Sequence, residues 1–234
     1  ELINLNAIMN LPKGTEHFMS DLHGEYDAFY HIINNCSGVI REKVAMLYGD
    51  ELTVYEQQEL CTLIYYPREK LSILMDENKV NDEWYRNVLD QLIQIAKLLS
   101  SKYTRSKVRK AMPVDFAYII DELIHAQKDE DDNRSVYHRQ IMETILSLHN
   151  GDEFLVALTD LIKRLAVDHL HILGDIYDRG SHADKILDLL MEHHSVDIQW
   201  GNHDILWMGA FCGNPVCMAL VVRNNIKYKT MSIL

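Results

Sequence analysis

Three short runs of the sequence combine residue types that bind divalent metal ions and transfer protons. The first contains Asp21 and His23, a carboxylate and an imidazole separated by one residue. Both side chains are good ligands for a borderline divalent metal ion. A pair of this kind also arises by chance in a chain with 12 histidines, and Asp21 could simply cap a following helix. The pair therefore gains weight only from the two other runs.

The second run is residues 174–180, GDIYDRG. Its glycines allow the backbone to turn tightly beneath a ligand. Asp175 and Asp178 supply carboxylates, and the planar guanidinium of Arg179 suits phosphate oxygens. Asp178 and Arg179 could alternatively form a surface ion pair. Five fixed residue types at this spacing are rare by chance, which favours a functional loop.

The third run is residues 201–204, GNHD. Asn202 offers a neutral oxygen ligand, whereas the neighbouring His203 cannot easily point in the same direction. Asn202 is therefore the candidate metal ligand, and His203 is the candidate proton donor.

The elements that must position these runs are three short strands. An apolar or alternating segment precedes each run, and a helical pattern follows it. The strands are expected at residues 16–20, 169–173 and 196–200. The helices are expected at 25–35, at 183–192 and from about 205. Because ligands bind at the carboxyl ends of parallel strands, the three runs should lie at one edge of a sheet.

The middle of the chain has a different character. Residues 37–150 show helical periodicity and little strand signal, and Thr53 with Glu56 forms a capping box. We therefore expect an α/β domain from residues 1–36 and 151–234, with residues 37–150 as an all-helical insertion. A charged loop is expected at 128–134. The basic run 101–110 could bind a second phosphate or a regulatory anion, but a solvated helix face is favoured.

Composition excludes several classes of protein. With 10 Gly and 4 Pro, the chain has too few turn residues for an all-β fold. A net charge of -12 argues against a general nucleic-acid binder and is compatible with a cation site. The 4 cysteines form no CxxC pair, which indicates reduced thiols and a cytoplasmic protein. No segment looks like a signal peptide or a membrane span. Since the sequence does not begin with Met, we expect a piece of a longer chain.

The three runs in this order resemble the calcineurin-like metallophosphoesterases, in which two metal ions cleave phosphate esters. Residues 12–26, 171–190 and 199–210 are similar to stretches of the bacterial class 3 fructose-1,6-bisphosphatases. The long interval between Asp21 and Asp175 is also shared with that group. The resemblance implies a partial metallophosphoesterase sandwich, its N-terminal half, that carries the large helical insertion.

The resemblance also implies a metal site. Asp21 and His23 would bind the first metal ion, Asp175 would bridge both ions, and Asn202 would bind the second. The implied cofactor is a pair of Mn²⁺ ions, with Mg²⁺ or another transition metal as alternatives. Two neighbouring cations need a bridging carboxylate, and together they activate a water for attack on phosphorus.

The remaining candidates would carry the catalytic chemistry. The resemblance implies that His203, held by Asp178, is the general acid and that Arg179 binds phosphate. The expected reaction is hydrolysis of the 1-phosphate of fructose 1,6-bisphosphate to fructose 6-phosphate and phosphate, a step of gluconeogenesis. The alternatives are a phosphoprotein or dinucleoside-polyphosphate phosphatase of the same superfamily and a non-catalytic scaffold. A sugar bisphosphate is the expected partner; a homo-oligomer is compatible with the sequence, and neither nucleic acid nor a membrane is expected.

One departure from the family concerns the remaining ligands. The family's further histidine ligands come later in the chain, after further strands. His193 and His194 precede the third strand, so we expect them on the surface and not as substitutes. The 234 residues alone should therefore bind metal weakly, show little phosphatase activity and expose apolar sheet surface that promotes association.

Overall fold

The computed structural model describes residues 1–126 and 132–234, which form two compact units. The helical unit comprises residues 1–14 and 34–166, and the sheet unit comprises residues 15–33 and 167–234. The protein is thus a mixed α/β chain, mostly helical, with a small parallel sheet. None of the described helices is long and apolar enough to cross a membrane.

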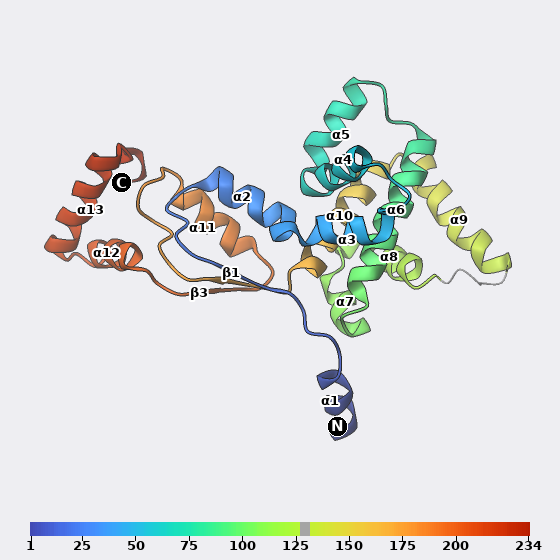
Figure 1. Ribbon diagram of the computed structural model, residues 1–234, viewed down its shortest axis with the longest axis horizontal. Coiled ribbons are helices and arrows are strands. Elements are labelled where there is room, and N and C mark those ends of the chain that lie inside the picture. Colours follow the sequence, from blue (N-terminus) through green and yellow to red (C-terminus); the bar gives the residue numbers. More distant parts are fainter. Residues whose placement is uncertain (127–131) are drawn as a thin grey trace. The chain divides into compact units, whose positions relative to one another are not determined.

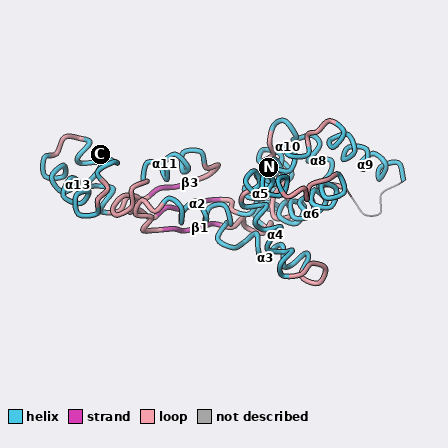
Figure 2. Tube along the Cα trace, turned by 90° about the horizontal axis from the view of Figure 1, so that it is seen from above, coloured by secondary structure: helices cyan, strands magenta, loops and turns pink. Residues whose placement is uncertain are grey.

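The sheet consists of three parallel strands in the order β1-β2-β3 (Figures 1 and 2). The strands are β1 (Glu16–Met19), β2 (His169–Ile172) and β3 (Val196–Ile198). All three lie where the sequence predicts them, although β3 ends two residues early. In the register of the sheet, His171 lies between Phe18 on β1 and Asp197 on β3.

Two helices cover one face of this sheet. They are α2 (Tyr26–Asn35) and α11 (Ala183–Glu192), which lie on the same side of the strands in Figure 1. Side chains alternate between the two faces of a strand, so Leu170 and Ile172 both enter the core beneath these helices. They pack in one cluster with Phe29 of α2 and Ile186 of α11. This cluster fixes where the carboxyl ends of the strands lie.

The chain after β3 forms two further helices of the sheet unit. Helix α12 (Asn202–Phe211) packs against α13 (Pro215–Tyr228), where Gly209 approaches the side chain of Cys217. A short 3₁₀ turn, Met231–Ile233, ends the unit. The strand–helix order predicted for all three runs is therefore present.

The helical unit is built around two long helices that pack on each other, α6 (Asp82–Ser100) and α10 (Gly151–Ala166). Their buried faces supply many of the fully buried side chains of the unit. The other helices of the unit are α1 (Leu2–Met9), α3 (Val39–Tyr48), α4 (Val54–Tyr65), α5 (Pro67–Asp76), α7 (Arg105–Ala111), α8 (Ala117–Ile124) and α9 (Asp132–Ser147). Two 3₁₀ turns, Cys36–Gly38 and Val114–Phe116, complete it.

The division between the units differs from the expected boundaries. The expected insertion ended at residue 150, whereas the helical unit extends through α10 to Ala166. The reason is that α10 buries its apolar face against α6, within the helical unit. The expected charged loop at 128–134 is wrong at its end, because α9 begins at Asp132. The first part of that loop lies outside the described residues.

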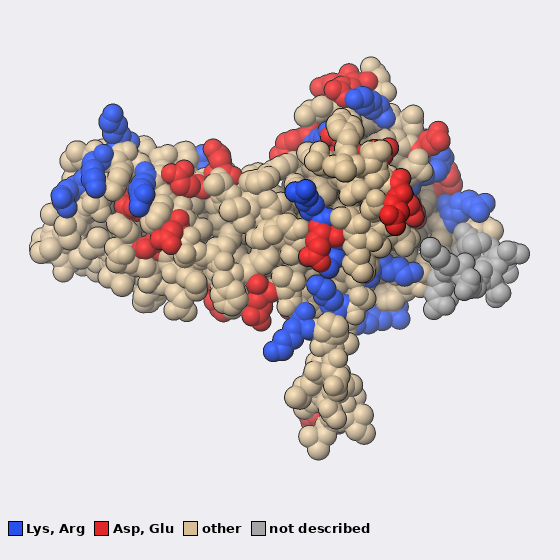
Figure 3. Space-filling view, in the orientation of Figure 1, with Lys and Arg blue, Asp and Glu red and all other residues tan. Residues whose placement is uncertain are grey.

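Local signals in the helical block agree with the structure. The Thr53 hydroxyl accepts the amide N–H of Glu56, whose carboxylate accepts the amide of Thr53 in return, so the predicted capping box is confirmed. In the basic run, Arg105 pairs with Asp121 at 3.2 Å and Lys107 lies over an aromatic ring. Acidic and basic side chains are mixed on the visible surface of this unit (Figure 3). These observations favour a solvated helix face.

The packing of α10 gives a stability prediction. Replacing Leu158, which is fully buried, by alanine should lower the free energy of unfolding by about 2–5 kcal/mol, because a cavity remains in the core. The same change at Leu148, which is 64% exposed in the same unit, should cost less than about 1 kcal/mol. Urea unfolding followed by circular dichroism measures both. Equal losses would show that α10 does not form the core of this unit.

Candidate functional site

Three loops of the sheet unit begin where the strands end. They are residues 20–25, 173–182 and 199–201, and they carry the three runs singled out in the sequence. Backbone hydrogen bonds join the first loop to the second: Asp21 donates to Gly174 at 3.2 Å, and His23 donates to Asp175 at 2.8 Å. The loops that follow β1 and β2 are therefore fixed against each other.

Glycines make this close approach possible. Gly24 has φ +70, and a Cβ at that position would lie 2.5 Å from the carbonyl oxygen of Gly180. Gly180 in turn donates its amide N–H to the carbonyl of His23. Gly174, at φ +98, has the same constraint, since a Cβ there would overlap the amide of Gly201. Side chains at these positions would separate the loops.

The buried carboxylate of Asp204 joins the second loop to the third. It accepts the backbone N–H groups of Asp175 (2.7 Å), Ile176 (2.9 Å), Tyr177 (3.2 Å) and Gly201 (2.9 Å). The residue is only 5% exposed. Sequence reasoning gave Asp204 no role, although a carboxylate at the third position of α12 is a recognisable capping signal.

Three of the candidate metal ligands have unusual backbone conformations. Asp21 (φ 56), His23 (φ 48) and Asp175 (φ 56) all lie in the left-handed region. Non-glycine residues rarely adopt it, and such residues gather at functional sites where surrounding bonds hold them in place. The inter-loop hydrogen bonds supply that restraint here.

The structure brings some of the candidate ligands together. Asp21 Oδ1 lies 3.4 Å from His23 Nε2, and the Asp21 side chain is 64% exposed. Asp175 uses one carboxylate oxygen to accept the backbone N–H of His203 at 3.1 Å. Asn202 is exposed at the first position of α12. Within the described residues, Asp21, His23 and Asp175 do not form a group whose ligand atoms all lie within 4.8 Å.

Asp178 lies among three cationic or proton-carrying side chains. Its carboxylate, only 3% exposed, lies 3.4 Å from His203 Nδ1, accepts Arg179 Nε at 3.0 Å and lies 3.8 Å from His23 Nδ1. The imidazole rings of His23 and His203 meet edge to face at 6.1 Å. The ion pair between Asp178 and Arg179 therefore forms. It is not a simple surface pair, because the Asp178 carboxylate is buried and also faces two histidines.

Helix α12, which follows the third loop, stacks on the second loop. The ring of Tyr177 lies parallel to that of Trp207 of α12, with centroids 4.6 Å apart. Burial and the nearby carboxylates of Asp204 and Asp184 raise the pKa of Tyr177 above its usual value. The stack adds an apolar contact to the polar bonds that hold α12 against the second loop.

His193 and His194 lie away from these loops. They precede β3, at the opposite end of the strand from residues 199–201. Their rings stack at 4.4 Å, and each bonds a backbone carbonyl, of Ser195 and Val167 respectively. His193 is half-buried, and this burial, together with the neighbouring His194, lowers its pKa to about 4. Neither histidine joins the candidate ligands.

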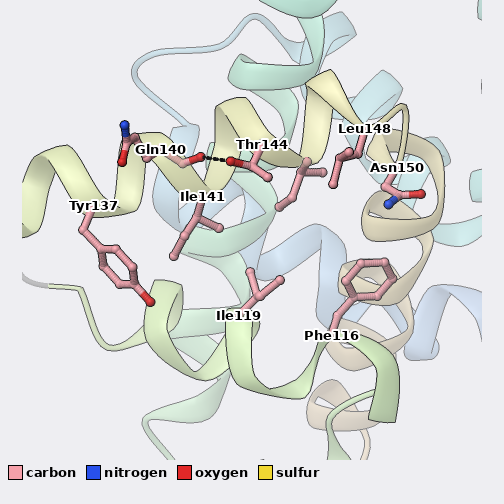
Figure 4. Close-up of a pocket in the computed structure, with 9 residues that line it drawn as sticks. Phe116, Ile119, Tyr137, Gln140, Ile141, Thr144, Leu148 and Asn150 are labelled. Atoms are coloured by element: carbon pink, nitrogen blue, oxygen red, sulfur yellow. Dashed lines mark hydrogen bonds between the residues drawn. The ribbon is translucent and has the colours of Figure 1, made fainter.

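A separate cavity lies wholly within the helical unit. It encloses about 320 Å³ between α8 and α9, and its lining is mostly apolar, including Phe116, Ile119 and Ile141 (Figure 4). The polar groups at its wall, such as Gln140 and Thr144, are neutral, and the Thr144 hydroxyl is bonded to the Gln140 carbonyl. The cavity shares no residue with the three loops, and none of the described residues that line it carries a charge.

Comparison with known proteins identifies the family. A family model for Firmicute fructose-1,6-bisphosphatase matches residues 1–234. The chain belongs to this family. The predicted resemblance to the class 3 fructose-1,6-bisphosphatases is thereby confirmed. No solved structure matches the chain.

Curated members of the fructose-1,6-bisphosphatase family align with the whole chain. The class 3 enzyme 1 of Clostridium beijerinckii is 56% identical over 234 residues, which is 100% of this chain and 35% of that protein. The class 3 enzymes of Listeria innocua and Bacteroides fragilis are 54% and 52% identical, also over 100% of this chain, and it covers 36% and 35% of them. The chain therefore spans about a third of the length of these relatives.

The four bonds to Asp204 give a prediction for this family member. Asp204→Asn replaces one acceptor oxygen by an N–H donor that faces backbone donors, so the free energy of unfolding should fall by about 2 kcal/mol. The second loop should also loosen, and Mn²⁺ affinity should fall with it. Thermal unfolding and Mn²⁺ titration measure the two effects. Asp188→Asn on the exposed side of α11 is the matched control and should change neither. An unchanged melting temperature in Asp204→Asn would contradict this role.

Proposed function

We propose that the protein hydrolyses the 1-phosphate of fructose 1,6-bisphosphate, giving fructose 6-phosphate and phosphate in gluconeogenesis. The printed names of its relatives, class 3 fructose-1,6-bisphosphatases, support this substrate. The observation that carries the proposal is the arrangement around Asp178, whose buried carboxylate faces the candidate acid His203 and the candidate phosphate ligand Arg179. These two groups are what a phosphate monoester with a poor leaving group requires.

A divalent cation suits the donors in the first two loops. Asp21 Oδ1 and His23 Nε2 lie 3.4 Å apart, so a carboxylate oxygen and an imidazole nitrogen are adjacent. We propose that these two residues hold one Mn²⁺, that Asp175 bridges to a second and that Asn202 binds the second. The alternatives are Mg²⁺, which prefers the carboxylate and amide oxygens among these donors, and transition metals other than Mn²⁺, which also bind the imidazole nitrogen of His23. When bound, such ions supply an activated water and neutralise phosphate charge.

Arg179 binds the phosphate in this proposal. Its side chain is 62% exposed, while its Nε is held by Asp178 at 3.0 Å. The bond to a buried carboxylate orients the guanidinium plane, and the two terminal nitrogens can then meet two phosphate oxygens. Because this bond already restricts the Arg179 side chain, less conformational entropy is lost when substrate binds.

His203 gives the proton to the departing sugar oxygen. Its Nδ1 faces Asp178 at 3.4 Å, so Nε2 is the atom available to the substrate. The backbone N–H of His203 donates to Asp175, which ties the proposed acid to the proposed bridging ligand. A sugar alkoxide is a poor leaving group, and general-acid help of this kind contributes about 10²–10⁴-fold.

The wider setting follows from the same family resemblance. We propose that the small parallel sheet is part of a metallophosphoesterase sandwich and that the protein acts in the cytoplasm. A phosphate-release assay with added Mn²⁺ tests the substrate. Fructose 1,6-bisphosphate should be hydrolysed in preference to a phosphopeptide or a dinucleoside polyphosphate. A preference for either of the other substrates would overturn the sugar assignment.

Asp175→Asn tests the bridging role in the full-length enzyme. The change keeps the shape of the side chain but removes the charge that two cations share, so turnover should be abolished and bound Mn²⁺ should fall sharply. Metal analysis and phosphate release measure these effects. Asp188→Asn, on the exposed surface of α11, is the control and should keep both. Wild-type activity in Asp175→Asn would remove this residue from the mechanism.

His203→Asn tests the proton transfer separately from metal binding. The variant should keep its metal ions while kcat on fructose 1,6-bisphosphate falls by about 10²–10⁴-fold. The loss should be smaller on p-nitrophenyl phosphate, because the phenolate leaves without a proton. A loss of equal size on the two substrates would show that His203 acts in some other way.

A further inference from the structure

A second group of metal-binding side chains lies on the face of the sheet opposite α2 and α11. His169 and His171 of β2 and Asp197 of β3 are the one set of three His, Cys, Asp or Glu residues among those described whose ligand atoms all lie within 4.8 Å of one another. We propose that these three residues form a binding site for a borderline transition-metal ion, with Zn²⁺ as the representative. This site is separate from the loops at the strand ends and goes beyond the proposed phosphatase function.

The geometry follows directly from the strands. His169 and His171 are two residues apart on β2, so both point to the same face, and Asp197 lies beside His171 in the register of β3. Asp197 Oδ2 lies 2.9 Å from His169 Nε2 and 3.3 Å from His171 Nδ1. Ligand bonds of about 2.0–2.1 Å in a tetrahedral zinc site place neighbouring donors about 3.3 Å apart. The observed separations from the carboxylate are therefore close to those of metal ligands.

The second nitrogen of each imidazole also has a suitable neighbour. His169 Nδ1 lies 2.6 Å from the hydroxyl oxygen of Ser195. His171 Nε2, which is buried and has no hydrogen bond among the described residues, lies 3.8 Å from a carboxylate oxygen of Glu16 on β1. Metal-bound histidines usually donate their other ring N–H to such a group, which orients the ring. The ring nitrogens of His169 and His171 are thus arranged as in two oriented metal-binding histidines.

Packing holds the rings in place but leaves a position open. The ring of Phe18 on β1 stacks on His171 with centroids 4.4 Å apart and planes within 13°. The Asp197 side chain is 61% exposed, so water can complete the coordination of an ion held by the three residues. Two imidazoles and one carboxylate favour Zn²⁺ over Mg²⁺, which takes oxygen ligands.

The alternative is a hydrogen-bonded network in which Asp197 simply accepts from both imidazoles. Zn²⁺ binding distinguishes the proposed metal site from this network, provided that the proposed phosphatase ligands are removed first. In an Asp21→Asn/Asp175→Asn background of this chain, equilibrium dialysis followed by metal analysis should still find one Zn²⁺ per chain, and no Mg²⁺. Co²⁺ in its place should show the visible absorption of a low-coordinate ion. Because this background lacks the proposed catalytic ligands, failure of the phosphatase assignment would not affect the result.

Single substitutions in the same background identify the ligands. His169→Asn and His171→Asn should each lower Zn²⁺ affinity by about 100-fold or more, since loss of an outer partner alone typically costs 10–100-fold. His149→Asn, an exposed histidine of the helical unit, is the matched control and should leave affinity unchanged. Asp197→Asn provides a second test at an exposed position if a histidine variant does not fold. Absence of Zn²⁺ from the background protein, or wild-type affinity in the ligand variants, would overturn the proposal.

Discussion

The candidate active site depends on one buried carboxylate. Asp204 accepts four backbone N–H groups from two loops that α11 and β3 separate in the sequence, and it lies at the start of α12. An isolated buried charge would be costly, but four donors and the amino end of a helix compensate for it. Asp175 and His203, which flank these bonds, are positioned through them. Rigid positioning of this kind is what two-metal phosphate chemistry requires.

Close contact between the first two loops imposes a second constraint. Gly24 and Gly180 meet backbone to backbone, where no Cβ fits, and Asp21 and His23, which precede Gly24, adopt left-handed conformations. The inter-loop hydrogen bonds hold this conformation against its intrinsic cost. The glycines and the strained ligands therefore act together. The local strain places the carboxylate of Asp21 next to the imidazole of His23.

The two faces of the small sheet have different chemistry. On one face, Leu170 and Ile172 complete an apolar core with α2 and α11. On the other face of the same strand, His169 and His171 meet Asp197. Because side chains alternate between the two faces of a strand, the four consecutive residues of β2 contribute to both the apolar core and the polar cluster. The phosphatase candidates lie at the strand ends, apart from the face that carries the separate metal site proposed above.

Much of this protein was determined by its sequence alone. The three strand–loop–helix units, the Thr53 capping box and membership of the fructose-1,6-bisphosphatase family all follow from short-range patterns, because spacing, turn residues and caps act locally. The candidate metal ligands and the general acid were also chosen from the sequence, and their roles stay predictions. Asp178 was expected beside His203, and the structure places it there at 3.4 Å.

Only the tertiary structure decided how distant segments meet. Helix α10 has an amphipathic pattern that would suit a sheet or a helix as partner, and packing on α6 places it in the helical unit. Asp204 shows a capping signal, but its bonds to the second loop depend on the parallel arrangement of β2 and β3. The pairing of Asp197 with His171 depends on strand register, since a shift of one residue would turn Asp197 to the opposite face. Register and packing are long-range choices, and no local pattern in the chain encodes them.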